Sequence, residues 1–277
     1  MTEGSAGKVF RWKDLPMTQV LGGKMDRAGF RGDHCLLTFN WIKPGMGRWK
    51  PHSHPFDQVV LTLAGTQILE VEGEAFKCPA GSIVRVPGNA EHTGWPDGDE
   101  PVLNIDVFPL RPDYLHLTKH QEEYKQPQSQ PGQVFHQVPD AEPFKGRWKS
   151  DTKGLVYMWD ELPKVELADG MMKRSAFRGD DSLTVFNTVE PGMKRTEPHS
   201  HPFDQLVLIV KGTLILEIDG ETMECGPGSI VRVPANAMHT GWPVGGEPVL
   251  NIDVFAPARK DYLHLTDYQT EFSVKAS

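Results

Sequence analysis

The chain of 277 residues is one sequence unit written twice. Residues 8–108 align without a gap onto residues 155–255, and 60 of the 101 aligned positions are identical. The shared segments FRGD, PHSHPFDQ, GSIVRVP and EPVLNIDVF each lie 147 residues from their copies. Copies this similar must adopt the same fold, so we expect two equivalent domains rather than one large domain.

The segment between the copies has a different composition. It contains the run QPQSQPGQ at Gln126–Gln133, which is typical of an extended linker. We therefore predict an N-terminal domain at 1–124, a linker at 125–150 and a C-terminal domain at 151–277.

Composition and charge exclude several classes of protein. Hydrophobic residues make up 38% of the chain, and no run approaches the roughly 20 apolar residues of a membrane helix. The net charge of −8 disfavours a nucleic-acid partner. The first residues have no apolar signal core, and the three cysteines are too few for a disulfide scaffold: Cys35, Cys78 and Cys225. These features predict a cytoplasmic protein that binds no membrane.

Each copy has the periodicity of strands. The 27 glycines and 23 prolines divide short runs rich in Val, Ile, Leu and Thr. The expected strands include Val59–Leu63, Gln67–Val71, Ile83–Val86 and Val102–Phe108. One short helix is expected near residues 112–123. Many short strands at this spacing predict an all-β chain, with an antiparallel barrel or jelly roll in each copy.

A histidine cluster recurs in both copies. His52 and His54 are two residues apart, so on a strand their side chains share one face. Gln58 has the same parity, and His92 follows a later strand that a barrel can bring close. The second copy has His199, His201, Gln205 and His239. Isolated histidines are more often surface or loop residues, but recurrence of the whole set at one offset favours a metal site in each copy.

The spacing of these residues resembles that of the cupin superfamily. The first cupin motif has His-x-His, a carboxylate and a later glycine, and the second has glycine, proline and a third histidine. The matching residues are His52, His54, Gln58, Gly65, Gly81, Pro87 and His92, with the same set 147 residues later. The resemblance implies two tandem cupin domains, each a jelly-roll β-barrel. It covers both copies and says little about the reaction, because this fold hosts many chemistries.

One departure from the cupin motif concerns charge. Gln58 and Gln205 stand where cupins usually have glutamate. Three imidazoles and an amide leave the charge of a divalent ion uncompensated, which makes it a stronger Lewis acid. We expect two divalent transition-metal ions per chain, and this donor set does not choose among Mn, Fe, Co, Ni and Zn.

A polar strand face predicts further site residues. Asn104, Asp106 and Phe108 share one face, so Asp106 either transfers protons in a pocket or anchors a turn. The segment from Asp253 to Leu263 resembles the C-terminal end of small cupins that linearise unsaturated uronates. That resemblance implies the site residues Asp253, Phe255 and Arg259, and in the first copy Asp106, Phe108 and Arg111, whose segment is one residue shorter.

Arginines and tryptophans recur near these motifs. Arg85 and Arg232 either bind a substrate carboxylate or pair with Glu70 or Glu217 of the barrel, and pairing is the simpler interpretation. Trp95 and Trp242 either wall the pocket or cap the core.

Three functional hypotheses follow from this site. The leading one is a metal-dependent enzyme that acts on a small oxygenated acid by isomerase or lyase chemistry, with Asp106 or Asp253 transferring the proton. The alternatives are an Fe(II) dioxygenase and a non-catalytic binding protein. We expect a small, anionic substrate, a pseudo-dimer of the two domains within the chain, and room for further homo-oligomerisation.

Overall fold

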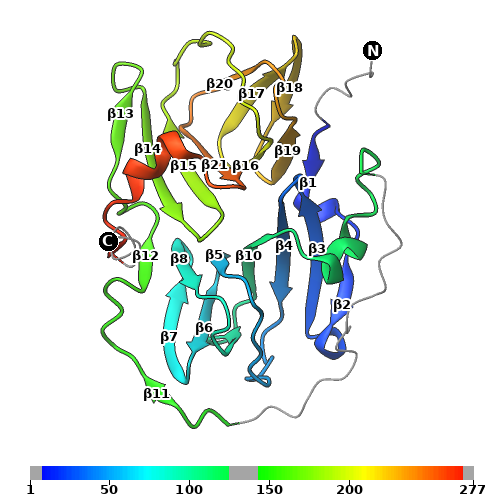
Figure 1. The fold of residues 1–277 in the computed structure, drawn as a ribbon, viewed down its shortest axis with the longest axis vertical. Coiled ribbons are helices and arrows are strands. Elements are labelled where there is room, and N and C mark those ends of the chain that lie inside the picture. The colour runs from blue at the N-terminus through cyan, green and yellow to red at the C-terminus, as the bar shows by residue number, and fades with distance from the viewer. Residues whose placement is uncertain (1–7, 125–142, 271–277) are drawn as a thin grey trace. The chain divides into compact units, whose positions relative to one another are not determined.

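The computed structural model describes residues 8–124 and 143–270 as strands joined by turns and short 3₁₀ helices. Figure 1 shows the order of the elements along the chain. Two compact units divide the chain. One, here called the first barrel, comprises Pro16–Arg31 and Cys35–Glu161. The other, called the second barrel, comprises Met1–Leu15, Gly32–His34 and Leu162–Ser277.

The first barrel has two sheets, in which the pairings are antiparallel except for one short parallel pairing at an edge of the smaller sheet. The seven strands of the larger sheet run in the order β12 (Val156–Met158), β8 (Ser82–Val86), β5 (Gln58–Ala64), β10 (Val102–Pro109), β4 (Cys35–Ile42), β3 (Met25–Arg31) and β2 (Thr18–Val20). The four strands of the smaller sheet are β11 (Arg147–Trp148), β7 (Glu74–Pro79), β6 (Thr66–Val71) and β9 (His92–Pro96). The 3₁₀ helices are η2 (Leu21–Gly23) and η3 (Pro112–Thr118).

The second barrel repeats this plan. Its larger sheet runs β1 (Phe10–Arg11), β19 (Ser229–Val233), β16 (Gln205–Lys211), β21 (Val249–Phe255), β15 (Leu183–Val189), β14 (Met172–Arg178) and β13 (Val165–Leu167). Its smaller sheet has β18 (Glu221–Cys225), β17 (Thr213–Ile218) and β20 (His239–Val244), and its 3₁₀ helices are η1 (Trp12–Asp14) and η4 (Lys260–Thr266). The all-β prediction with one barrel per copy is confirmed.

The first strand of each copy belongs to the barrel formed by the other copy. β1 pairs with β19 in the second barrel, and β12 pairs with β8 in the first. The two pairings are equivalent, because Phe10 lies opposite Ile230 and Tyr157 lies opposite Ile83, each 147 residues from its counterpart. An unpaired sheet edge accepts a strand readily, which explains this reciprocal exchange.

The exchange corrects the predicted domain limits. The described residues 8–15 pack with the second barrel, although the sequence assigns them to the N-terminal domain. Residues 151–161 pack with the first barrel, although the sequence assigns them to the C-terminal domain. Most of the predicted linker, residues 125–142, lies outside the described residues, and its end forms β11.

Cross-strand register brings polar residues together inside the first barrel. In the pairing of β10 with β4, Asp106 lies opposite Thr38 and Asn104 lies opposite Asn40. All four side chains are buried, with apolar residues such as Ile105 and Phe39 on the other face of the same strands. The barrel therefore has a polar interior beside an apolar layer, which positions the site described next.

No helix in the described part of the chain is long and apolar enough to span a membrane. The three cysteines are buried free thiols. The predicted helix near residues 112–123 is a 3₁₀ helix that ends at Thr118.

Candidate metal centre

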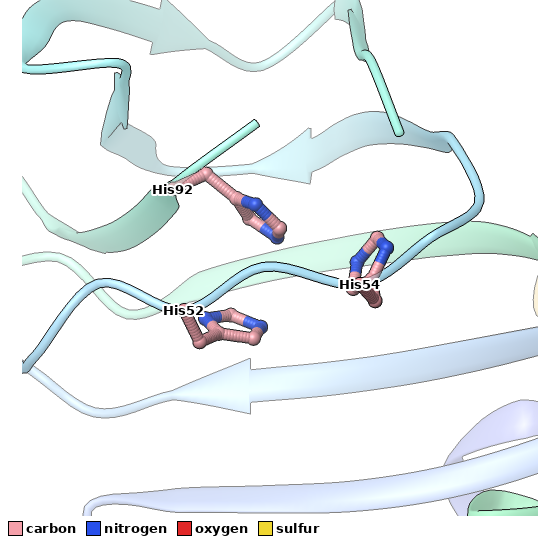
Figure 2. A group of neighbouring side chains, drawn as sticks. All are labelled: His52, His54 and His92. Carbon is pink, nitrogen blue, oxygen red and sulfur yellow. The ribbon is translucent and has the colours of Figure 1, made fainter. Parts of the chain in front are cut away.

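Three imidazoles converge in the first barrel. His52, His54 and His92 each offer one ring nitrogen within 4.8 Å of the others, and Figure 2 shows the rings turned toward a common space. His52 and His92 form a two-residue bridge in which each backbone N–H donates to the carbonyl of the other, at 3.0 and 2.9 Å. The convergence was predicted, but its expected cause was partly wrong, because His52 and His54 lie on an extended loop ahead of β5 rather than on a strand.

Backbone carbonyls fix the orientation of two of these rings. The Nδ1 atom of His54 lies 2.6 Å from the carbonyl of Phe56, and that of His92 lies 2.9 Å from the carbonyl of Ala90. A carbonyl only accepts, so each Nδ1 donates and each Nε2 keeps its lone pair. The Nε2 atom of His92 is buried without a hydrogen-bond partner among the described residues. A divalent transition-metal ion would satisfy this atom, so the residues fit such an ion.

Two of these imidazoles, those of His52 and His92, are neutral at physiological pH. Burial, with the nearby imidazoles of His92 and His54, lowers the pKa of His52 to about 3. Burial also lowers the pKa of His92 to about 4. Neutral imidazole is the form that binds a metal, so no proton has to leave before binding at pH 7.

Gln58 connects the histidines to a buried carboxyl group. Its side-chain oxygen lies 3.2 Å from the Nε2 atom of His54, and its amide group also hydrogen-bonds to Asp106. A carboxylate only accepts, so the amide nitrogen faces Asp106 and the amide oxygen faces the histidines. The oxygen is thus presented as a fourth donor, as the cupin motif predicts for this position.

Asp106 is held by several donors inside the barrel. Asn40 donates to it at 2.8 Å, Asn104 at 3.0 Å and Thr38 at 3.2 Å. Burial raises the pKa of Asp106, and the charge of Arg27 and these hydrogen bonds oppose that rise. A buried carboxyl can hold or release a proton, and the proton-transfer role of Asp106 stays a prediction.

Two arginines place positive charge at the same cavity. Arg111 makes a bidentate ion pair with Asp113, with distances of 2.9 and 2.6 Å. Its guanidinium also lies over the rings of Phe108 and Tyr114, 5.0 and 3.9 Å from their centroids. Arg27 donates to Asn40 at 2.5 Å and to the hydroxyl of Tyr114 at 2.6 Å.

Sequence reasoning missed Arg27, Asn40 and Tyr114. A signal existed, because Arg27 and Asn40 recur 147 residues later as Arg174 and Asn187, and Tyr114 recurs 148 residues later, past the extra residue of the second copy, as Tyr262. His116 also lines the cavity and was not among the predicted site residues.

The second barrel repeats the arrangement. The ring nitrogens of His199, His201 and His239 lie within 4.8 Å of one another, and the amide oxygen of Gln205 is 3.2 Å from the Nε2 atom of His201. Burial lowers the pKa of His239 to about 4. Asp253 accepts from Asn187 at 2.8 Å and from Gln205, and burial raises its pKa.

The extra residue in the second copy does not displace its arginine. Arg259 pairs with Asp261 and lies over the rings of Phe255 and Tyr262, as Arg111 does with its own neighbours. Arg111 and Arg259 are therefore equivalent.

A cavity of about 490 Å³ joins these groups in the first barrel. Of the predicted residues, it is lined by His52, Gln58, His92, Asp106, Phe108 and Arg111. Phe108 also makes an edge-to-face contact with His54, with 5.7 Å between ring centroids.

The structure does not bring the other predicted pocket residues into this lining. Arg85 pairs with Asp57 at 3.2 Å, and Glu70 pairs with Arg48 instead. In the second barrel Arg232 pairs with Asp204 at 3.1 Å and with Asp33 at 2.8 Å.

Trp95 is also absent from this lining. Trp95 packs against the apolar cluster that contains Met46, and its ring centroid lies 6.1 Å from that of Phe144. Trp242 lies beneath the guanidinium of Arg195. The ion pairs of the two strand arginines, Arg85 and Arg232, satisfy their guanidinium groups outside the cavity.

Comparison with known proteins agrees with this geometry. The chain is 32% identical over 105 residues to the pectin degradation protein KdgF of Dickeya dadantii (strain 3937), and this match spans 94% of that protein and 38% of this chain. Residues 185–255 match the cupin domain family, and residues 38–145 match the AraC-like ligand binding domain family. The chain belongs to the cupin superfamily. It is a bicupin, with one cupin domain in each half.

Solved structures share the two-barrel cupin fold. Oxalate decarboxylase of Bacillus subtilis, in the structure at pH 4.6, has a TM-score of 0.62 and 17% identity to this bicupin, covering 92% of this chain and 78% of that one. A cupin 2 conserved barrel domain protein of Leptotrichia buccalis has a TM-score of 0.60 and 11% identity, covering 90% and 96%. AerE of Microcystis aeruginosa has a TM-score of 0.58 and 15% identity, covering 91% and 97%. At these identities the likeness supports the fold.

Proposed function

We propose that this bicupin is a metal-dependent enzyme that acts on a small oxygenated acid, such as a sugar acid or a keto/enol compound, by isomerase or lyase chemistry. The observation that carries the proposal is one cavity lined by His52 and His92 of the histidine cluster, a buried carboxyl and two arginines. Their counterparts in the second barrel make equivalent contacts.

His52, His54, His92 and the amide oxygen of Gln58 would hold one ion, and their second-barrel counterparts would hold another. A bound divalent ion supplies Lewis acidity, which polarises a carbonyl or enol oxygen of the substrate. Since all four donors are neutral, an anionic substrate group meets no opposing charge from the ligands.

The protein's own residues supply the remaining functions. Arg27 and Arg111 attract the substrate carboxylate to the cavity. Asp106 takes a proton from the enol oxygen and returns it to carbon, so the conversion of enol to ketone is redox-neutral. Phe108 packs over His54 and keeps water from that side of the site.

The KdgF relative supports a uronate as the substrate class, because its name places it in pectin degradation. Two metal ions per chain and a small anionic substrate belong to this proposal. A cytoplasmic location and the oligomeric state stay predictions.

Turnover by metal-loaded protein tests the proposal. Unsaturated uronates, keto acids and enols serve as substrates, and loss of the ultraviolet absorbance of the enol serves as the readout. The Asp106→Asn, Asp253→Asn double variant should keep its metal and lose at least about 100-fold in turnover, the usual scale of general acid–base catalysis. Absence of turnover by the wild-type protein with every one of these compounds would overturn the proposal.

An Fe(II) dioxygenase is the second candidate, because three histidines around one ion leave positions open for substrate and O₂. Oxygen uptake separates the two functions. Iron-loaded protein that consumes O₂ in step with substrate supports the dioxygenase, whereas turnover under anaerobic conditions supports the isomerase or lyase.

A further inference from the structure

The two barrels are alike around the histidines and differ deeper inside. In the first barrel the interior positions on β5 and β6 hold Thr62 and Gln67, and the amide of Gln67 donates to the Thr62 hydroxyl at 2.8 Å. The equivalent positions in the second barrel hold Ile209 and Leu214. Both polar side chains are buried, with exposed fractions of 1% and 2%. Buried polar groups destabilise a core relative to apolar ones unless their hydrogen bonds are satisfied, so this pair calls for a reason.

The polar pair reaches the cavity of the first barrel through Gln67. Gln67 lines the same cavity as His52 and Asp106. Asn104 lies directly opposite Thr62 in the pairing of β10 with β5 and also lines the cavity. The side-chain oxygen of Asn104 is buried and has no hydrogen-bond partner among the described residues. Thr62, Gln67 and Asn104 thus form a polar floor, and one of its acceptors is open to a donor from a ligand.

In the second barrel two of the three floor positions are apolar, because Ile209 and Leu214 replace Thr62 and Gln67 while Asn251 matches Asn104. Leu214 belongs to one continuous cluster that also contains Val189, Met193 and Val207. Their counterparts in the first barrel fall into two separate clusters, with Val60 in one and Ile42 and Met46 in the other. The polar floor interrupts the apolar interior in the first barrel, and leucine and isoleucine fill the same place in the second.

The mouths of the two sites differ as well. Trp49 lines the first cavity, and its ring stacks on His52 with 4.8 Å between centroids. The equivalent residue in the second barrel is Thr196, which hydrogen-bonds to Thr240. His199 is correspondingly exposed, whereas His52 is half-buried. The first site is therefore more enclosed at its entrance and more polar at its base.

The floor lies a substrate length away from the histidines. His92 pairs with Val71 on β6, and Gln67 is four residues from Val71, which is about 13 Å along a strand. Thr62 is likewise four residues from Gln58 on β5. We therefore expect an extended six-carbon acid to reach Gln67 and Thr62 from the histidines better than a two- or three-carbon acid. The cavity volume lies in the range of small-molecule sites, roughly 300–1,000 Å³.

We propose that the first site is specific for an extended, polyhydroxylated acid whose far hydroxyl groups bind the floor formed by Thr62, Gln67 and Asn104, and that the second site lacks this preference. The inference rests on the proposed function, which places the acid group of the ligand at the histidines. Gln67 and Thr62 are the specificity-determining residues, and the two sites of one chain take different acids.

The test compares D-gluconate with hexanoate, which has the same number of carbons and no hydroxyl groups. Calorimetry measures the dissociation constants of both acids on two zinc-loaded proteins. The His199→Ala, His201→Ala variant has only the first site intact, and the His52→Ala, His54→Ala variant has only the second. The preference for gluconate is the ratio of the hexanoate dissociation constant to the gluconate dissociation constant. This ratio should be about tenfold greater at the first site, which is the effect of one net buried hydrogen bond.

Exchanging the floors provides matched controls. We would introduce Thr62→Ile and Gln67→Leu into the variant that has only the first site intact. This exchange should lower the gluconate preference about tenfold, to that of the second site. Ile209→Thr with Leu214→Gln, placed in the second-site protein, should raise it. The reciprocal pair keeps the proposal testable if one exchange prevents folding.

The outcomes separate this inference from the proposed function. Three results would each overturn the inference. They are equal gluconate preferences at the two zinc-loaded sites, a preference that neither exchange changes, and no gluconate binding at the first site. Failure of the intact single sites to take up zinc would instead count against the proposed function. A turnover assay is not needed, because binding alone gives the result.

Discussion

Replacing Gln58 by glutamate tests the link between the candidate metal ligands and the buried carboxyl. In the wild-type protein the amide nitrogen of Gln58 faces Asp106 and the amide oxygen faces His54. Gln58→Glu removes that donor and places a second carboxylate against Asp106. Both positions are buried, with exposed fractions of 8% and 5%. Two carboxylates at hydrogen-bond distance in a buried site share one proton, so one of the two pKa values rises strongly.

The magnitude follows from the lost hydrogen bond and the added charge. A hydrogen bond to a charged group contributes about 1.5–3 kcal/mol, and an unpaired buried charge costs more. We expect Gln58→Glu to destabilise the metal-free protein by about 3 kcal/mol at pH 7. A carboxyl whose pKa is higher in the folded than in the unfolded protein loses stability as the pH rises through the folded pKa. The cost relative to wild type should therefore be small near pH 4 and grow toward pH 8.

Urea denaturation of metal-free protein, followed by tryptophan fluorescence at several pH values, measures this effect. Gln205→Glu is the matched variant in the second barrel, where Gln205 bonds Asp253 in the same way. Adding a divalent metal should recover part of the loss, because its charge offsets the new carboxylate. A variant as stable as wild type at pH 7 without metal would refute the assigned contact between Gln58 and Asp106.

Three further predictions concern the metal, the pH and the exchanged strand. His52→Ala should remove about one of two bound metal equivalents, measured by elemental analysis, and full retention would contradict the ligand assignment. The metal-free protein should lose stability as the pH falls below about 6.5. The pKa values of His52 and His92, about 3 and about 4, lie below that of a histidine in the unfolded chain, so the unfolded chain takes up protons first. A denaturation midpoint that does not change from pH 7 to pH 4 would contradict this. Deleting residues 1–15 removes β1, which pairs with β19, and buried Trp12. Amide hydrogen exchange should therefore accelerate in β19 and not in β8. Equal acceleration in both strands would contradict the strand exchange.

The sequence predicted the strands and the histidine groups because both are local or repeated signals. The expected strand Ile83–Val86 is β8 with one more residue, and the expected Val102–Phe108 is β10. The histidines were found because a motif that recurs at one offset needs no knowledge of strand pairing. Alternation also placed Asp106 on the correct face, since side-chain direction follows parity along a strand.

Features that depend on which strand pairs with which could not be predicted. Periodicity shows that residues near Phe10 can form a strand, and it does not say that this strand joins β19 of the second barrel. The position of Arg85 along its strand is the one expected of a pocket residue. Its ion pair with Asp57 depends on the course of a loop, which the alternation of side chains along strands does not predict. Arg27 was missed for the same reason, because its partners Asn40 and Tyr114 come from other elements.

The pattern of identity between the two copies separates chemistry from selectivity. The residues assigned to the candidate chemistry have identical counterparts: the three histidines, the glutamine, the aspartate, the phenylalanine and both arginines. Thr38, which donates to Asp106, is an exception and is replaced by Val185. Thr62, Gln67 and Trp49, which line or support the remainder of the first cavity, are replaced by Ile209, Leu214 and Thr196. Substitutions remote from the reacting atoms change which ligand binds without moving the groups that would act on it. The two barrels are therefore best understood as one chemical centre built twice, with two different floors beneath it.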